Sequence, residues 1–417
     1  MSVVDLQQLA LRENEQTEWK ENVADINDVV ATLCAFANDL QNLGGGYVVC
    51  GAREESDPHG FPSAVFVGVT AKRLKEIENL VLARCRERVS PPITPLISEI
   101  EAAGDPSRRV LVFTQAATGT AHTFRRDHDG AKHYVRVSRS TLEARNGVLR
   151  ALLVRKGVQE PWDRRPCPQA TVEDLDLLTL RDTLNRLGLA EPPERYLSAE
   201  LSLSAFVPPL LVRESLTDTL RPRNFALLLF GKQPQRFVPG AISFFSSYEG
   251  IDRTSDRGQR IELASTLLDQ LRLLLPTVLA EARTLYDKSN LDQPTVSKYP
   301  ERALREAVVN GLVHRDYELF DPLRVTAFAD RIEINSPGGL PFGVSYPEFA
   351  AATTGPRWRN QTLAWFVSRL GYAEAEGQGL RTIARTMLAT GCPSPEYTAD
   401  DMHVVCTLRA HPRATQR

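Results

Sequence analysis

The sequence predicts a multidomain protein of the α+β class. Its 417 residues exceed the roughly 100 to 200 residues of one usual domain, so two or three domains are expected. Helical and strand-like apolar patterns both recur along the chain, and a stretch rich in Pro and charge after Arg155 has the composition of an exposed connection. The composition, 42% hydrophobic and 24% charged, excludes a collagen-like or wholly disordered chain.

Net charge and cysteine spacing exclude further classes. The formal net charge is −2, so no overall basic field indicates a nucleic-acid or membrane partner. The six cysteines lie far apart without a Cys-x-x-Cys pair, and neither a zinc site nor a disulfide framework is expected. No window reaches the ~18 consecutive apolar residues of a membrane span, and the N-terminus lacks a secretory leader pattern, so we expect a cytoplasmic protein without a membrane partner.

The first predicted domain covers residues 1–165 and mixes helices with strands. Apolar residues at helical spacing, interrupted by Gly44–Gly46 and followed by a β-branched run, predict a unit of helix, glycine turn and strand. Helices are predicted over Asp28–Leu40 and Lys72–Val89, and strands over residues 47–52, 110–115 and 133–138.

Charge is unevenly divided within this first domain. Residues 1–107 hold 9 Lys and Arg against 17 Asp and Glu, which gives −8, whereas residues 108–165 hold 13 against 5, which gives +8. A local basic surface predicts contact with an anionic partner. The alternative, with about even odds, is solvated surface charge that meets no partner.

Two further domains are predicted, a connecting α/β domain over residues 166–290 and a C-terminal domain over residues 291–417. Acidic residues after Thr171 and a glycine at Gly188 predict a capped helix between them. The other predicted elements are strands at Phe225–Gly231 and Ala241–Tyr248, a long helix around Ile261–Tyr286, and a helix that begins near Glu301.

Three polar residues share one face of the last of these helices. Glu306, Asn310 and His314 are spaced i, i+4, i+8, so their side chains project from nearly the same side. A carboxylate and a carboxamide one turn apart can orient a water and hold Mg²⁺ on phosphates, because Mg²⁺ prefers oxygen ligands. The alternative is an amphipathic helix whose polar stripe faces water.

Glycine-rich turns follow this helix at Ser336–Leu340 and at Glu376–Leu380, the second at the start of another predicted helix. Glycine lets backbone N–H groups approach a phosphate closely, and the helix N-terminus behind it carries partial positive charge. The order of helix, turn and helix therefore favours a phosphate site.

The strings REAVVNGLVHRDY, DRIEINSPGGLP and RNQTLAWFVSRLGYAEAEGQGL resemble the divergent GHKL-type ATP-binding domain, the fold of gyrase and histidine kinases, found in RecG-like and transcriptional-regulator proteins. The resemblance implies an α/β sandwich that binds ATP, with Glu306 as general base, Asn310 as Mg²⁺ ligand, and Gly377 and Gly379 in the phosphate loop. His314, Asn335, Gly338 and Gly339 are further nucleotide-binding candidates. ATP is either hydrolysed or held as a conformational clamp.

This C-terminal stretch departs from the family in one respect. The turn Asn335–Gly339 lacks the carboxylate with which typical members read the adenine amino group. No Gly-x4-Gly-Lys-Ser/Thr phosphate loop is present anywhere in the chain, so the sequence does not support a helicase motor.

A dense group of acids lies near the N-terminus. Glu13, Glu15, Glu18 and Glu21 surround Lys20, and Glu18 and Lys20 share a face if the segment is extended. Clustered carboxylates bind divalent metal and, with a lysine beside them, support phosphodiester cleavage. The alternative is a solvated acidic edge strand.

The strings ENEQTEWKEN, CAFANDLQNLGGGYVVCGAREE and KHYVRVSRST resemble the Schlafen-type AlbA-2 domain, a nucleic-acid-associated module. The resemblance implies that Glu13 and Glu18 match two acids that Schlafen ribonucleases use, with Mg²⁺ or Mn²⁺, to cleave structured RNA, and that Lys20 stands beside them. The third acid is open among Glu54, Glu55 and Asp57, and Arg53 lies where an acid would be expected.

Nucleic-acid contact is predicted on the basic segment. The candidates are Arg125, Arg126, Lys132, Tyr134, Arg136 and Arg139, with His133 and Arg145 beside them. If residues 132–138 form one strand, Lys132, Tyr134 and Arg136 share a face, and cations with an aromatic ring suit phosphate contact and base stacking. Strand-edge cations that discourage sheet aggregation are the alternative.

Two functions follow for the whole chain. The first is an effector that binds and cleaves RNA under the control of bound ATP, with phage defence as the expected biology. The second is a DNA-binding transcriptional regulator that ATP switches without chemistry at the N-terminus. A metabolic ATPase without a nucleic-acid partner fits the basic segment least well. A homo-oligomer is expected from the GHKL resemblance alone.

Overall fold

The computed structural model describes residues 5–56, 62–102, 105–127, 129–214, 218–282, 284–286, 295–341, 344–355, 357–373 and 378–415. The chain divides into two compact units, residues 1–160 and 161–417, and each is described by itself. The predicted α+β class is confirmed in both units.

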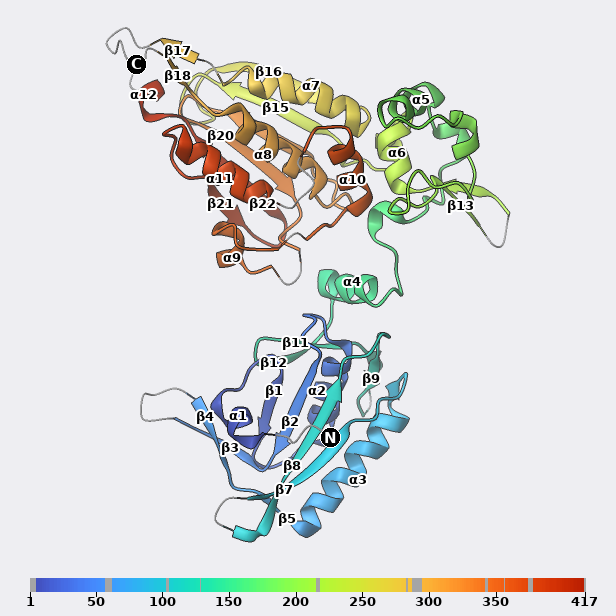
Figure 1. The fold of residues 1–417 in the computed structure, drawn as a ribbon, viewed down its shortest axis with the longest axis vertical. Helices are drawn as coiled ribbons and strands as arrows, with labels where there is room; N and C mark the ends of the chain where they lie inside the picture. Colours follow the sequence, from blue (N-terminus) through green and yellow to red (C-terminus); the bar gives the residue numbers. More distant parts are fainter. Residues whose placement is uncertain are drawn as a thin grey trace. The chain divides into compact units, whose positions relative to one another are not determined.

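Unit 1 contains the predicted helices and strands with small shifts in their ends (Figure 1). Its helices are α1 (Leu6–Leu11), α2 (Ile26–Asn38), α3 (Ala71–Glu87) and α4 (Asn146–Arg155). Its strands are β1 (Thr17–Lys20), β2 (Gly45–Cys50), β3 (Ala52–Ser56), β4 (Pro62–Phe66), β5 (Val69–Thr70), β6 (Val89–Ser90), β7 (Leu96–Ala102), β8 (Asp105–Ala116), β9 (Thr123–Arg125), β10 (Ala131–Lys132), β11 (Tyr134–Val137) and β12 (Ser140–Glu143).

A five-stranded sheet forms the centre of unit 1. Its order is β1-β2-β8-β5, with β7 also paired to β8, and β1 runs parallel to β2 whereas β2 and β8 are antiparallel. The apolar run of β2 is buried on both sides of this sheet. Val48 belongs to the core formed with α2 and α3, whereas Val49 belongs to a second cluster with Trp19. Burial on two faces explains why the strand reads as a continuous apolar run rather than an alternating one.

The glycine turn before β2 is required by close backbone approach. A Cβ on Gly46 would lie 2.5 Å from the Phe36 ring, and one on Gly45 would lie 2.1 Å from the Gln115 carbonyl oxygen. Gly45 also has a φ of +105°. The turn therefore lets α2 and β8 pack directly against β2.

Unit 2 is built on a six-stranded sheet with the order β16-β15-β19-β20-β22-β21. Its strands outside two short hairpins are β15 (Ser243–Tyr248), β16 (Arg257–Leu263), β19 (Leu323–Ala327), β20 (Arg331–Pro337), β21 (Glu396–Ala399) and β22 (His403–Arg409). Its helices are α5 (Leu177–Arg186), α6 (Asn224–Phe230), α7 (Leu267–Leu279), α8 (Glu301–Val313), α9 (Tyr346–Ala350), α10 (Gln361–Arg369), α11 (Gly379–Ala389) and α12 (Pro412–Thr415). The hairpins are β13 (Leu211–Arg213) with β14 (Leu220–Pro222) and β17 (Thr284–Tyr286) with β18 (Thr295–Ser297), and short 3-10 turns lie at η1 (Trp162–Arg164), η2 (Val172–Asp174), η3 (Pro193–Tyr196) and η4 (Pro234–Arg236).

Helices α7, α8 and α11 cover one face of this sheet, with α8 in contact with both of the others (Figure 1). Only β15 and β19 are parallel neighbours, and the other adjacent strands are antiparallel. One hydrophobic core extends from Cys167 to Ala410. It joins β15, β16 and α7, which precede residue 290, to the elements that follow it.

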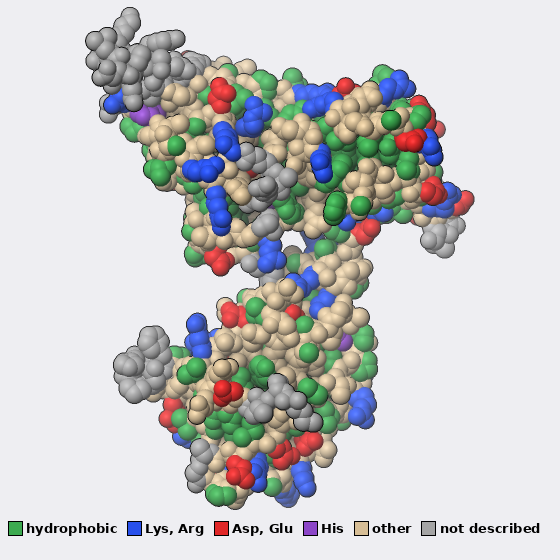
Figure 2. Space-filling model, viewed as in Figure 1, with side chains coloured by type: hydrophobic (Ala, Val, Ile, Leu, Met, Phe, Trp, Pro, Cys, Tyr) green, Lys and Arg blue, Asp and Glu red, His purple; other side chains and the backbone are tan. Residues whose placement is uncertain are grey.

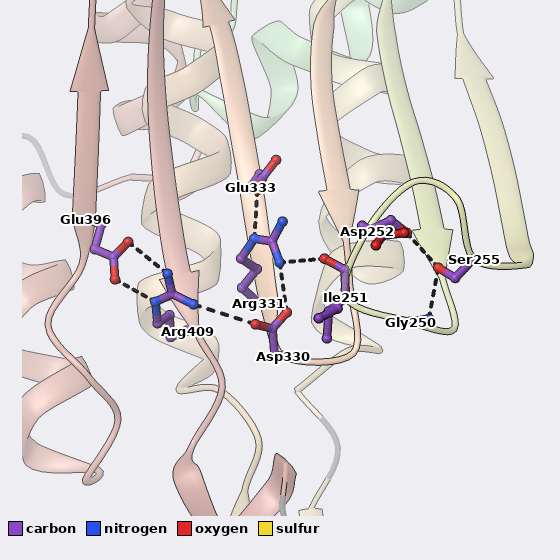
Figure 3. A network of polar contacts seen from close by, with 9 residues as sticks. All are labelled: Gly250, Ile251, Asp252, Ser255, Asp330, Arg331, Glu333, Glu396 and Arg409. Atoms are coloured by element: carbon purple, nitrogen blue, oxygen red, sulfur yellow. Dashed lines mark hydrogen bonds and ion pairs between the residues drawn. The ribbon is translucent and has the colours of Figure 1, made fainter.

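Two polar side chains of the sheet join strands and loops at one end of unit 2 (Figure 3). Arg331 donates to Glu333, Asp330 and the carbonyl of Ile251, and Arg409 pairs with Glu396 and Asp330. These residues lie on the strands that make the β19–β20 turn and on β22. The pairing satisfies charged groups on the sheet end without closing it into a hydrophobic contact.

Three local predictions for residues 161–290 were wrong. Residues 225–230 form helix α6 and not a strand, because seven consecutive buried apolar residues are buried on every side and such a run carries no period. Thr171 caps the 3-10 turn η2, whereas α5 starts later behind the Asp176 cap. The long helix expected around Ile261–Tyr286 is limited to α7, since β16 extends to Leu263.

All six cysteines are buried and none forms a disulfide. Within the part of the chain that the structure describes, no helix is long and apolar enough to cross a membrane.

Candidate functional site

A cavity of about 760 Å³ lies in unit 2 between the sheet and helices α8, α10 and α11. Its wall includes Ile334 and Ser336 of β20 and Tyr397 of β21. The volume is in the range of pockets that bind small organic ligands. The polar face predicted on α8 lines this cavity and does not face open water.

The structure brings three of the predicted residues together at one wall of the cavity. Glu306 and Asn310 both line it from α8, and Glu306 is only 7% exposed. Gly379, the first residue of α11, packs against both side chains. A Cβ at Gly379 would lie 2.2 Å from Glu306 Oε1 and 2.9 Å from Asn310 Nδ2. The N-terminus of an 11-residue helix is thereby placed beside a carboxylate and a carboxamide.

His314, the third residue of the predicted face, also lines the cavity, but it contributes a ring and not a charge. Its imidazole stacks on Trp358 with ring centroids 5.0 Å apart and planes 16° from parallel. Burial, reinforced by the Arg359 guanidinium, lowers the pKa of His314 to about 4. His314 is therefore neutral at pH 7, and the pair forms a flat, largely apolar surface.

The glycines of the first turn have a steric role. The N–H of Gly338 donates to the carbonyl of Met402 and that of Gly339 donates to the carbonyl of Asp401. A Cβ at Gly338 would lie 2.6 Å from Asp316 Cβ, and one at Gly339 would lie 2.4 Å from the Asp400 oxygen. Both glycines line the cavity, but these two N–H groups are already bonded within the protein.

Two other nucleotide-site candidates are placed differently. Asn335 belongs to β20 between Ile334 and Ser336, which line the cavity, and strand alternation directs its side chain to the opposite face of the sheet. Gly377 lies outside the described residues.

The sequence reasoning missed the cations at the cavity. Arg357, Arg369 and Arg381 all line it, and each is exposed. Among the described residues none of them makes an ion pair with a carboxylate; Arg381 donates to the carbonyl of Ala352. Figure 2 shows Lys and Arg side chains gathered over α8 and α11 on the face that it draws. The exposed arginines of these two helices are Arg302, Arg305, Arg381 and Arg385.

The acidic group predicted near the N-terminus is a charge-paired cluster in unit 1. Glu18 forms an ion pair with Lys20 at 2.7 Å and with Arg136, whose side chain is 5% exposed. Arg136 also donates to the carbonyls of Asn14 and Thr17. The Glu18 carboxylate thus neutralises a buried guanidinium.

Glu13 lies beside this pair. Its Oε1 accepts from the Trp19 N–H at 3.1 Å. Burial raises the pKa of Glu13, the Trp19 hydrogen bond opposes that rise, and the neighbouring Glu18 carboxylate adds to it. Glu54 and Glu55 are exposed on β3, where Glu55 pairs with Arg53, and Asp57 lies outside the described residues. Within those described, no three His, Cys, Asp or Glu side chains form a metal-binding group.

The face predicted to carry Tyr134 and Arg136 points inward. Both side chains are buried, Tyr134 against Phe124 and Arg136 against Glu18, so neither offers a surface for base stacking or phosphate contact. The physical reason is that the buried Glu18 carboxylate requires a counter-charge. Lys132 pairs with Asp129 and Glu143, and Arg126 pairs with Asp28. Arg125 and Arg139 are exposed, and no ion pair joins either to a described residue.

Two family models match the chain. The model described as "Schlafen, AlbA_2" matches residues 13–145, and the model described as "Putative ATP-dependent DNA helicase recG C-terminal" matches residues 321–408. Both predicted resemblances and their order are confirmed. The two domains indicate a protein that binds nucleotide and nucleic acid. Helix α8, with Glu306 and Asn310, precedes the second matched range.

Two solved structures are similar to the chain. The crystal structure of the DIP2311 protein from Corynebacterium diphtheriae is 17% identical with a TM-score of 0.45, and the match covers 95% of this chain and 65% of that one. The solution NMR structure of the "N-terminal Domain of Putative ATP-dependent DNA Helicase RecG-related Protein" from Nitrosomonas europaea is 19% identical with a TM-score of 0.23, over 27% of this chain and 70% of that one. The chain thus spans less than two thirds of the DIP2311 protein. No curated protein matches it.

We expect His314 to titrate near pH 4, well below the ordinary histidine value of about 6.5. Because the unfolded chain takes up this proton below pH 6.5 while the folded protein does not, the stability of unit 2 is complete above pH 6.5 and falls as the pH drops toward 4. NMR titration of the imidazole C–H signal, assigned by its absence in His314→Gln, measures the midpoint. A midpoint at or above 6 contradicts the burial of the ring, and His314→Gln should flatten the pH dependence of the urea midpoint.

We expect Glu18→Ala to destabilise unit 1 by about 3 kcal/mol, because the variant leaves the Arg136 guanidinium buried without its carboxylate. Urea unfolding measures the change. Glu21→Ala is the matched control, since Glu21 is exposed and only 3.8 Å from Arg53, and its effect should stay below about 1 kcal/mol. A fully stable Glu18→Ala protein that has lost a divalent-dependent RNA cleavage would show that this acid serves chemistry.

Proposed function

We propose that this chain is a nucleic-acid-binding regulator switched by a magnesium nucleoside triphosphate, ATP by family resemblance, bound in the unit 2 cavity. The observation that carries the proposal is the meeting of Glu306, Asn310 and Gly379 at one wall of that cavity. A carboxylate and a carboxamide are oxygen ligands that suit Mg²⁺, and Gly379 opens a helix whose first N–H groups have no intrahelical acceptor.

The rest of the cavity fits the other parts of a nucleotide. The N-terminus of α11 and the cations Arg357, Arg369 and Arg381 favour polyphosphate charge. The stacked pair of His314 and Trp358 offers a flat, uncharged surface of the kind on which a base packs. Mg²⁺ bound with the nucleotide would neutralise phosphate charge beside Glu306 and Asn310. Holding the triphosphate is the role supported here, and turnover is a separate readout of the same experiment.

For the N-terminal unit the contacts favour binding over cleavage. Glu18, the acid that the Schlafen resemblance assigns to metal, is engaged by Lys20 and Arg136. Exposed cations at Arg125 and Arg139 are available to phosphates. RNA cleavage in phage defence is the second candidate, favoured by the closeness of the Glu13 and Glu18 carboxylates, which raises the pKa of Glu13. Divalent-dependent cleavage of tRNA would identify it.

Nucleotide binding is tested by calorimetry with Mg-ATP on the full chain. Asn310→Ala should weaken binding by about 10 to 100-fold, as loss of a metal-orienting group does, and Glu306→Gln should weaken it or abolish turnover. Glu301→Gln is the matched control, because Glu301 is exposed on the same helix, away from the cavity wall. Its affinity should equal that of the unaltered chain.

An absence of heat with any magnesium nucleotide on folded protein would overturn the proposal. Equal affinities for Asn310→Ala and Glu301→Gln would show that the nucleotide binds elsewhere.

Nucleic-acid binding is tested by replacing both exposed arginines of unit 1. The Arg125→Ala, Arg139→Ala double variant should lower affinity for DNA or RNA at low salt, and the slope of log affinity against log salt should fall by about two phosphate contacts. Fluorescence anisotropy over a salt series measures both. Arg73→Ala, whose side chain pairs with Glu76, is the control. An unchanged slope in the double variant would exclude these two residues as phosphate contacts.

A further inference from the structure

The first residues of unit 2 are anchored to the cavity. Trp162, Asp163, Arg164 and Arg165, called here the coupling segment, follow directly after Glu160, where unit 1 ends. The first three form the 3-10 turn η1, which contacts α10. Helix α10 in turn supplies Gln361, Ala364, Trp365 and Ser368 to the cavity wall.

Asp163 caps α10 from about 200 residues away in the sequence. Its Oδ2 accepts from the N–H of Thr362 at 2.7 Å and from the N–H of Leu363 at 3.4 Å. A helix is ordinarily capped by its own N-cap side chain. Here the N-cap residue Asn360 donates instead to the carbonyls of Val313 and Arg315 at the end of α8. The start of α10 is therefore held by α8 on one side and by the coupling segment on the other.

The Asp163 carboxylate is costly to keep where it is. It is fully buried, and its Oδ1 has no hydrogen-bond partner in the described part of the chain. A buried carboxylate with half of its oxygens unpaired loses solvation that two backbone donors only partly replace. An apolar residue would fill this position at a lower cost, so stability alone does not account for an acid here.

The neighbours of Asp163 extend the same connection. Arg164 donates to Thr362 Oγ1 and to the carbonyl of Phe206, which also lines the cavity. Trp162 stacks on Tyr317, with ring centroids 5.4 Å apart and planes 12° from parallel. Arg165 pairs with Glu318 at 3.2 Å. Tyr317 and Glu318 follow α8 and lie within four residues of His314.

We propose that the coupling segment transmits occupancy of the cavity to the N-terminal unit, with Asp163 as the positioning residue that reads the start of α10. This inference rests on the proposed function. A ligand that fills the cavity contacts α10 on one turn, and the N–H groups that Asp163 holds are on the same turn. A shift of α10 strengthens or breaks those bonds, and the segment joins covalently to unit 1.

The experiment measures affinity for nucleic acid with and without saturating Mg-ATP. In the unaltered chain the nucleotide should change this affinity by about fivefold or more. Asp163→Ala should bring the ratio to about one while still binding Mg-ATP, and Asp163→Asn, which keeps a capping oxygen, should restore part of it. Asp176→Ala is the matched control, because Asp176 caps α5 by the same kind of bonds and does not line the cavity.

Hydrogen exchange supplies a readout that needs no variant. The Thr362 and Leu363 amides should change their protection when Mg-ATP binds, and tryptic cleavage after Arg164 should change with it. A chain that binds Mg-ATP with no change at these amides, or an Asp163→Ala protein with the full ratio, overturns the inference. A chain that does not bind Mg-ATP at all refutes the proposed function instead, so the two failures are distinguishable.

Discussion

The packing of helix α8 is the constraint on which the rest of unit 2 depends. The helix contacts α7 and α11 on its flanks and the sheet beneath, so nearly all of its residues are buried. Glu306 and Asn310 nevertheless project from it, and a buried carboxylate is unfavourable unless something polar surrounds it. Gly379 permits α11 to begin against both side chains, where its free N–H groups provide that polar surrounding. A side chain at 379 would separate the two helices.

Unit 1 solves a related problem with opposite charges. Its positive segment carries many arginines, but the structure uses most of them internally. Arg136 neutralises Glu18 in the interior, and Arg126 and Lys132 pair with nearby acids at the surface. The formal excess of +8 in that segment therefore overstates the charge that a nucleic acid would meet. Only cations without such partners contribute fully to phosphate contact.

Prediction from the sequence succeeded where a pattern had one structural meaning. The i, i+4 spacing of Glu306 and Asn310 placed both on one face, and the glycines at 44–46 marked a real helix-to-strand turn. It failed where the pattern was silent on partners. The run at 225–230 is equally apolar in every direction, and alternation at 132–138 does not say which face looks inward. Gly338 and Gly339 looked like phosphate ligands, yet their N–H groups meet carbonyls from the distant β22 end.

The sequence by itself determined the class of the chain, the order of its two recognisable domains and the polar face of α8, because these follow from local periodicity and from motifs that are contiguous along the chain. Only the tertiary structure decided that Arg136 is buried against Glu18, that Trp358 stacks on His314, and that Asp163 caps a helix nearly 200 residues later. Those contacts join residues far apart in the sequence, and spacing along a chain holds no information about which distant charge, ring or N–H group will share one buried volume.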